Sequence, residues 1–394
     1  LDDLRYSNFF SDVVTSVGIG EKDYEKIQKE QSLSTGGIGL SFNVLPDSSG
    51  NKFLLSAGLH GSALKKNFSK LESLMNDTIN GFRLNEIKRL EELTQFEIAG
   101  KEKSITQSGH ILAMNGASAQ MSKFGAVSEF VGGVSSIHNL KTLRDSNGKI
   151  KMEVLLESFS KLKSFINPVS KIEVVISAIN QNFDKGTTTK TGLETLDVLN
   201  GVDLQSEEIA WITGSDVNFC AQAFPTVGYD HPDAPILTVL GAVLRNGFLH
   251  SAIREKGGAY GSGAQQDSAS RSFRFFSYRD PNCQETFNAF NESIEWSLKF
   301  INSEKLEEGI LGVISSIDKP GSPAGEARAD FNQNIRGIDQ SKRKIFRSRV
   351  INCSVERLVE VSNKYLTGEP KRSVISGKHF EKEIKDLGLS IHNV

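Results

Sequence analysis

Residues Leu249–Gly261 read L-H-S-A-I-R-E-K-G-G-A-Y-G and close a long apolar helical pattern. The pattern begins at Asp233, where a carboxylate at the N-cap and an early proline favour the start of a helix. Its apolar face runs to about Arg254 and consists of Ile236, Leu240, Val243, Leu244 and Phe248. Gly257 and Gly258 then predict the end of the helix and a turn into a strand, because glycine adopts the left-handed conformation without penalty.

Strand and helix patterns alternate on both sides of this stretch. Apolar residues at every second position predict strands over residues 38–44, 52–59, 217–223 and 273–275, and a further apolar run predicts one over 171–179. Apolar residues at three- and four-residue spacing predict helices over 64–75, 87–98 and 287–298. We therefore expect an α+β fold in which each sheet is mostly antiparallel and packed with helices.

The length of the chain predicts two domains. With 394 residues it exceeds the size of one ordinary core and suits two domains. The stretch over residues 181–192 is polar and indicates a loop or linker, and a short helical pattern follows over 193–199. We place the boundary near residue 203, which gives domains over 1–203 and 204–394.

Composition excludes several classes of protein. The net charge of −2 gives no reason to expect a nucleic-acid or anionic-membrane partner. No apolar run reaches the length that crosses a bilayer, so a soluble protein is expected, in the cytoplasm, a periplasm or an organelle. Three cysteines lie far apart, at Cys220, Cys283 and Cys353, which argues against a disulfide framework. The chain starts with Leu1 rather than Met, which indicates a fragment or a processed product.

The histidines do not form a zinc motif. None of the seven is three or four residues from another, and neither H-E-x-x-H nor H-x-x-E-H occurs. Each histidine is therefore expected to be structural or solvated. A G-x-S-x-G nucleophile motif is also absent from the sequence. The chain is not expected to bind a catalytic metal by itself.

A family resemblance rests on the spacing from Arg254 to Tyr260 around Gly-Gly-Ala-Tyr-Gly. This stretch resembles the presequence-protease branch of the pitrilysin/insulinase family of zinc metalloproteases, in their C-terminal half. Further matching segments lie in the expected order at Thr35–Ile38, Gln107–His110, Asp216–Asn218 and Phe275–Asn282, the last reading F-F-S-Y-R-D-P-N. The resemblance therefore runs along most of the chain.

The resemblance implies a division of labour between two halves of a protease. Complete members have four homologous α+β domains that close around a chamber in which unfolded peptides are degraded. Residues 1–203 would be the third domain and 204–394 the fourth. Zinc would be held by the N-terminal half, on the same chain or a separate subunit, so this chain alone is expected to be inactive.

The resemblance also implies roles for individual residues. Tyr260 would hydrogen-bond the scissile carbonyl or its oxyanion, and Arg254 would contact the substrate backbone beside it. The intervening Gly257, Gly258 and Ala259 are the expected substrate-binding residues. From spacing alone, Arg254 equally fits a surface residue at a helix end, and Tyr260 a half-buried strand aromatic.

Two other classes of function stay open. The first is a non-catalytic binding or scaffold subunit of the same fold, which needs neither the arginine nor the tyrosine. The second is an unrelated α+β binding protein, which requires the matching segments to be accidental.

Overall fold

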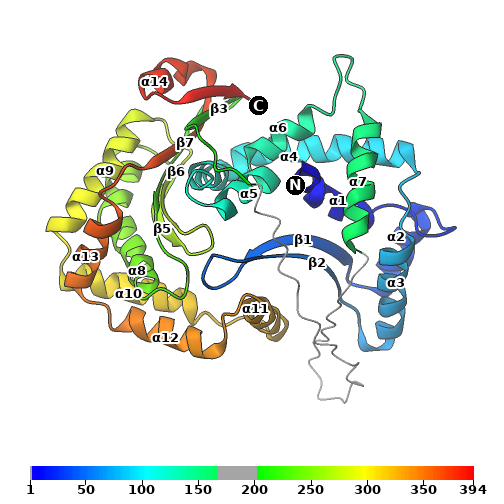
Figure 1. Ribbon diagram of the computed structural model, residues 1–394, viewed down its shortest axis with the longest axis horizontal. Helices are drawn as coiled ribbons and strands as arrows, with labels where there is room; N and C mark the ends of the chain where they lie inside the picture. Colours follow the sequence, from blue (N-terminus) through cyan, green and yellow to red (C-terminus); the bar gives the residue numbers. More distant parts are fainter. Residues whose placement is uncertain (1, 167–201) are drawn as a thin grey trace. The chain divides into compact units, whose positions relative to one another are not determined.

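A computed structural model describes residues 2–166 and 202–394, which form two compact units (Figure 1). Unit 1 lies within residues 1–44, 55–107 and 130–170, and unit 2 within 45–54, 108–129 and 171–394. The predicted strand over 171–179, the linker over 181–192 and the helix over 193–199 lie outside the described residues. The boundary near residue 203 therefore stays a prediction.

Unit 1 is mainly helical, and the predicted strands over 38–44 and 52–59 are confirmed. They pair as the two-stranded sheet β1 (Ile38–Pro46) and β2 (Phe53–Gly61). Phe10 is fully buried, with its ring 5.9 Å from Phe42 of β1 and 5.2 Å from Phe159. The helices around this core are η1 (Asp2–Tyr6), α1 (Ser7–Val14), α2 (Tyr24–Ser34), η2 (Lys65–Asn67), α3 (Phe68–Gly81), the first part of α4 (Ile87–Ser118), α6 (Val134–Lys141) and α7 (Met152–Ile166).

Unit 2 is built on a six-stranded mixed sheet. The strands are β3 (Ile209–Thr213), β4 (Phe219–Pro225), β5 (Gly261–Asp267), β6 (Ser272–Tyr278), β7 (Lys371–Gly377) and β8 (Ser390–Asn393), in the order β5-β6-β4-β7-β3-β8. The pairs from β5 to β7 are antiparallel, whereas β3 pairs in parallel with both β7 and β8. Together with the helices, this sheet confirms the expected α+β fold.

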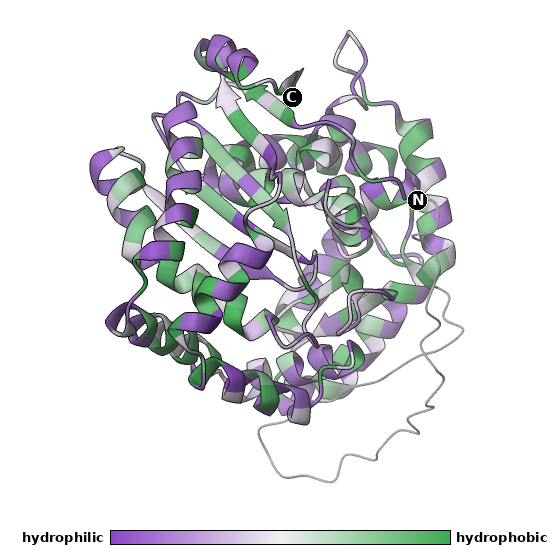
Figure 2. Cartoon of the chain, turned by 60° about the vertical axis from the view of Figure 1, so that its left-hand side comes forward, coloured by the Kyte–Doolittle hydropathy of each residue, from purple (hydrophilic) through white to green (hydrophobic). Residues whose placement is uncertain are grey.

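Helices cover both faces of this sheet. On one face, Phe273 and Phe275 of β6 join a core with α8 (Ala234–Leu244) and α9 (Gln284–Lys299). On the other face, Phe276 and Tyr278 meet His110 in the second part of α4. The remaining helices of the unit are α10 (Ser303–Ile317), α11 (Pro323–Ile335), α12 (Gln340–Ile351), α13 (Val355–Tyr365), η4 (Lys378–Phe380), α14 (Glu381–Asp386) and most of α5 (Lys123–Gly132). Figure 2 shows that these helices carry both hydrophobic and hydrophilic residues, as amphipathic helices do.

The long helix of unit 2 changes its winding halfway. After α8 the chain continues as the π-helix η3 (Arg245–Lys256), closed by a five-residue hydrogen bond from Gly257 N to Ala252 O of 3.1 Å. The predicted apolar face placed Phe248 in the core, but Phe248 is half-buried and Leu249 is fully buried. The wider winding explains this difference, because it moves the next inward position from four to five residues after Leu244.

The start of α8 is where it was predicted, but the expected N-cap interaction is wrong. The Asp233 carboxylate makes no hydrogen bond to the first turn of the helix. It instead accepts from Arg357, Lys364 and Tyr365 on α13. Competing cations more than 120 residues away therefore replace the local cap.

The helix Ala234–Lys256 is long and apolar enough to cross a membrane by length and composition alone. This differs from the expectation that no such run exists, because an 18-residue stretch of the helix keeps two or fewer charged residues. Half of that stretch is buried inside the structure. Leu237, Leu240 and Leu244 are fully buried against the sheet and neighbouring helices, as in the core helix of a folded domain.

Candidate functional site

The turn after η3 explains both of its glycines. Gly258 has a φ of +81°, the left-handed conformation in which a Cβ is unfavourable. A Cβ on Gly257 would lie 2.6 Å from the carbonyl oxygen of Ile253. Main-chain hydrogen bonds of 3.1 Å, from Gly258 N to Arg254 O and from Ala259 N to Ile253 O, close the helix. Each spans one residue more than in an ordinary Schellman motif, as the wider π-helix requires.

Tyr260 lies at the end of this turn with its side chain in solvent. The residue is 70% exposed, and its ring meets the edge of the Tyr278 ring at a centroid distance of 5.6 Å. Its main-chain N–H donates to the carbonyl oxygen of Arg279 at 3.3 Å. The preceding Ala259 is 4% exposed, so only its main chain is placed to meet a substrate. The turn thus fixes the backbone of Tyr260 and leaves the phenol accessible.

Arg254 is exposed on the last turn of η3 and contacts a histidine. Its Nη1 lies 3.1 Å from Nε2 of His250. Because a guanidinium only donates, Nε2 must accept, which places the ring proton on Nδ1, 3.5 Å from the Glu255 carboxylate. This contact uses one of the five N–H donors of Arg254. Sequence reasoning missed His250, although its four-residue spacing from Arg254 is a usable signal.

His110 packs under the site from the second part of α4. Its ring meets the Tyr278 ring edge-to-face at 4.8 Å. Burial lowers the pKa of His110, which favours the neutral imidazole, and its buried Nδ1 has no hydrogen-bond partner. A Cβ on the adjacent Gly109 would lie 2.5 Å from the ring of Phe219, so this glycine allows the helix to approach β4 closely. His110 therefore acts here as an aromatic packing residue, as a structural histidine was expected to.

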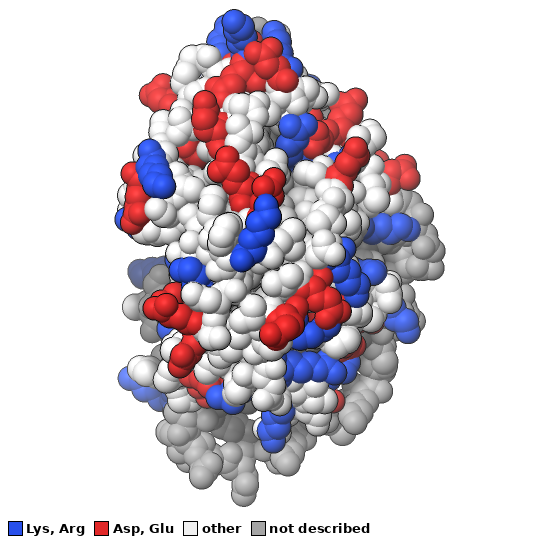
Figure 3. Space-filling view, turned by 90° about the vertical axis from the view of Figure 1, so that its left-hand side faces the viewer, with Lys and Arg blue, Asp and Glu red and all other residues white. Residues whose placement is uncertain are grey.

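Metal-binding groups do not gather in the part of the chain that the structure describes. Within residues 2–166 and 202–394, no group of three or more His, Cys, Asp or Glu could hold a metal ion. We therefore assign zinc to no residue of this chain. Lysines and arginines are interspersed with acidic residues on the face shown in Figure 3, where charges of one sign do not form a continuous patch.

Two family models match the chain. Residues 1–143 match the associated domain of subfamily C of the M16 peptidases, and residues 215–373 match "PreP C-terminal domain". The mitochondrial presequence protease of Drosophila melanogaster is 29% identical over 368 residues, which cover 91% of this chain and 35% of that protein. The chain therefore spans about a third of the length of this relative.

Solved structures agree in fold. An inactive M16 peptidase domain from Pseudomonas fluorescens superposes with a TM-score of 0.54 at 13% identity, covering 94% of this chain and 87% of that one. Pitrilysin superposes with a TM-score of 0.51 at 11% identity, covering 94% of this chain and 38% of that one. On the matching domains, relatives and fold, the chain belongs to the M16 (pitrilysin) family of peptidases and corresponds to the C-terminal part of a presequence-protease-like member.

Proposed function

We propose that this chain is the C-terminal half of a zinc endopeptidase that degrades unfolded peptides in a closed chamber. Its contribution is a pair of hydrogen-bond donors, Arg254 and Tyr260. The observation that carries the proposal is that both side chains are exposed at opposite ends of one turn, which main-chain hydrogen bonds hold in shape. A turn of this kind presents donors without spending them on contacts within the chain.

The chemistry of the two donors fits peptide hydrolysis. Attack on a peptide carbonyl places negative charge on its oxygen, and donors aimed at that oxygen lower the barrier. Tyr260 would donate its phenolic proton to the oxyanion, and Arg254 would bind a neighbouring carbonyl of the substrate. The main chain of Gly257, Gly258 and Ala259 would line the substrate between them.

The zinc half is the implied partner. The family resemblance assigns the metal to an N-terminal half, where zinc supplies the activated water when bound. Residues 1–203 and 204–394 would then be the third and fourth domains of the complete enzyme. This chain alone should not hydrolyse peptides, and it should bind peptide substrates only as one wall of the chamber.

Hydrolysis of a flexible peptide by the complete or reconstituted protease tests the proposal. Tyr260→Phe removes one donor atom and should reduce kcat by about 10²- to 10³-fold with little change in KM. Tyr24→Phe is the matched control, because the hydroxyl of Tyr24 lies on α2 near Glu25 and has no proposed role. Zinc content and thermal unfolding should match wild type in both variants.

The opposite results separate the alternatives. Unchanged turnover in Tyr260→Phe would remove the oxyanion role and leave this half as a chamber wall. The absence of hydrolysis even by the wild-type, zinc-loaded protein would favour the non-catalytic scaffold.

A further inference from the structure

Three separate segments of the chain meet beneath the turn that presents Tyr260. They are Asp216–Asn218, the residues up to Asn282 that follow β6, and the turn at Gly257 itself. We propose that Asn282 is a positioning residue, which holds this turn in the shape that places Tyr260 for catalysis. The inference rests on the proposed function of Tyr260 and adds a residue that is not in contact with the substrate.

The main contact is one hydrogen bond from a side chain to the main chain. Nδ2 of Asn282 donates to the carbonyl oxygen of Gly257 at 2.7 Å. The last carbonyls of a helix have no partner within the helix, and Gly257 directly follows η3. Because a carbonyl only accepts, the amide nitrogen rather than the amide oxygen of Asn282 must face it. Asn282 therefore caps the helix at the point where the turn begins.

Buried partners fix Asn282 in turn. Its main-chain N–H donates to Oδ1 of Asp280 at 3.0 Å, and its carbonyl oxygen accepts from Nδ2 of Asn218 at 3.1 Å. Asp280 and Asn218 are both fully buried, and their main chains exchange hydrogen bonds of 2.8 and 2.9 Å. Thr286 of α9 donates to the second carboxylate oxygen of Asp280 at 2.7 Å. The Asn282 side chain is thus mounted on a rigid, satisfied polar network.

The same segment also holds Tyr260 directly. Arg279, three residues before Asn282, accepts the main-chain N–H of Tyr260 and has a φ of +49°. A non-glycine residue keeps such a conformation only where its surroundings determine it. The turn is therefore tied to one segment at two points, Gly257 and Tyr260. Loss of the first tie leaves the second to hold the position of the phenol.

The reach of the effect follows from geometry. A donor must lie within about 2.7–3.1 Å of the developing oxyanion, and a misplacement of about 1 Å can cost about 10² in rate. Asn282→Ala removes the tie at Gly257 and keeps the chemical groups of Tyr260 and Arg254. The expected effect is therefore on kcat rather than on substrate binding.

A double-mutant cycle in the complete or reconstituted protease tests this inference. Asn282→Ala should lower kcat by about 10- to 100-fold and change KM by less than about threefold. In the Tyr260→Phe background the same substitution should cost less than about threefold, because the two residues act through one donor. Asn352→Ala is the matched control, since Asn352 donates to the carbonyl oxygen of Ser348 at the same kind of helix end, at 2.8 Å. It should leave turnover unchanged.

Each outcome of the cycle has a distinct meaning. If Tyr260→Phe lowers kcat but Asn282→Ala does not, or if the two losses multiply, the positioning role is overturned while the oxyanion role survives. If Tyr260→Phe has no effect, the proposed function fails and the positioning role fails with it.

A measurement on this chain by itself guards against trivial misfolding. Hydrogen–deuterium exchange of the peptide over residues 254–262 should be faster in Asn282→Ala than in wild type. Exchange in β4 and β7 should stay unchanged, which shows that the sheet is intact. Unchanged exchange in the turn, or faster exchange throughout unit 2, would contradict a local positioning role.

Discussion

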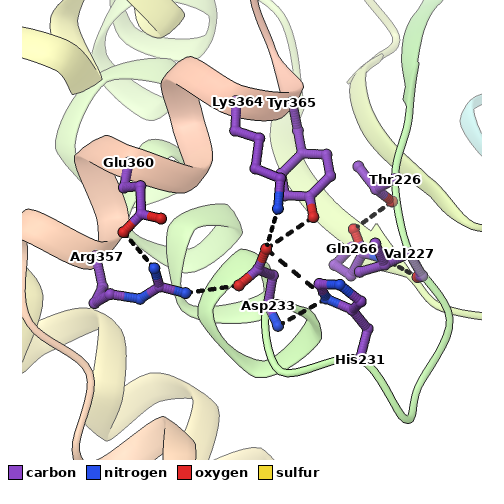
Figure 4. Close-up of polar contacts among 9 residues, drawn as sticks. All are labelled: Thr226, Val227, His231, Asp233, Gln266, Arg357, Glu360, Lys364 and Tyr365. Carbon is purple, nitrogen blue, oxygen red and sulfur yellow. Dashed lines mark hydrogen bonds and ion pairs between the residues drawn. The ribbon is translucent and has the colours of Figure 1, made fainter.

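The two ends of the helix Ala234–Lys256 treat polar groups in opposite ways. At its start, the Asp233 carboxylate is 4% exposed and accepts from Arg357, Lys364 and Tyr365 at 2.6, 2.9 and 2.8 Å (Figure 4). At its end, Tyr260 and Arg254 present their donors to solvent. Saturated polar groups stabilise a fold, whereas available donors cost it little and can bind something else. The comparison therefore separates a structural end from a functional end of one helix.

The structural end should dominate stability. Asp233→Ala leaves two cations and a phenol without their acceptor, and should lower the free energy of unfolding by about 2–3 kcal/mol. This figure is below the usual cost of breaking a buried pair because Arg357 and Lys364 are partly exposed and regain water. Thermal and urea unfolding of the chain measure it. Asp318→Ala breaks an exposed ion pair with Arg347 and is the control with little expected change. Equal loss in the two variants would contradict the structural reading of Asp233.

The functional end should tolerate less change in backbone than in stability. Gly258→Ala forces a Cβ into the left-handed conformation and should cost about 1–2 kcal/mol of unfolding free energy. It should also displace the turn and reduce peptide turnover well beyond the loss of folded protein. Gly214→Ala is the control, because Gly214 has no close neighbour and no positive φ. A turnover loss that merely follows the unfolded fraction would contradict the role of the turn.

The buried carboxylates near the two ends should respond to pH in opposite directions. Burial raises the pKa of Asp233, but hydrogen bonds from Lys364 and Tyr365 and nearby positive charge outweigh it, so the pKa falls below its ordinary value of 3.8. Its contribution to stability is present above pH 3.8 and lost as pH falls through the lower folded pKa. Burial of Asp280 instead raises the pKa of that carboxyl above 3.8. Its contribution is present below pH 3.8 and lost as pH rises through the folded pKa.

Unfolding at a series of pH values checks these signs. Asp233→Asn should flatten the loss of stability on the acid side of pH 3.8. Asp280→Asn should flatten the decline on the other side. Either variant changing the opposite limb would show that the sign assigned to that carboxyl is wrong.

The smallest effect is expected from the thiols, which belong to neither end. Cys220 and Cys283 are fully buried with sulfur atoms 3.8 Å apart, and burial raises the pKa of Cys220. Burial also raises the pKa of Cys353 to about 11. Thiolates are the reactive form, so alkylation of the native chain near pH 7.5 should be slow at all three. Mass spectrometry after iodoacetamide treatment checks this, and urea-unfolded chain is the control. Fast labelling of Cys220 in the native chain would contradict its burial.

Local patterns predicted most of the elements of unit 2. Alternating apolar residues located β4 and β6, and Asp233 with its nearby proline located the start of α8. The widening into η3 was missed, because a helical pattern cannot distinguish four- from five-residue spacing over only two turns. The burial of Leu249 in place of Phe248 is the consequence.

Contacts between distant segments were beyond local patterns. The sequence singled out Gly257 and Asn282 as parts of two motifs, but their hydrogen bond joins residues 25 positions apart. The partners of Asp233 on α13 and the packing of His110 on Tyr278 are equally non-local. No periodicity encodes such pairs, since they form only when the sheet brings its strands together. The site residues themselves were found because Arg254 and Tyr260 share one short turn.

The most direct test is the effect of Tyr260→Phe and Asp233→Ala on both turnover and stability. The complete or reconstituted zinc-loaded protease is assayed with one flexible peptide at a temperature at which both variants are folded. Our account predicts that Tyr260→Phe loses about 10²-fold or more in kcat with unchanged unfolding, whereas Asp233→Ala unfolds more easily with unchanged kcat. Wild-type turnover in Tyr260→Phe, or a kcat loss in Asp233→Ala as large as in Tyr260→Phe, would contradict it.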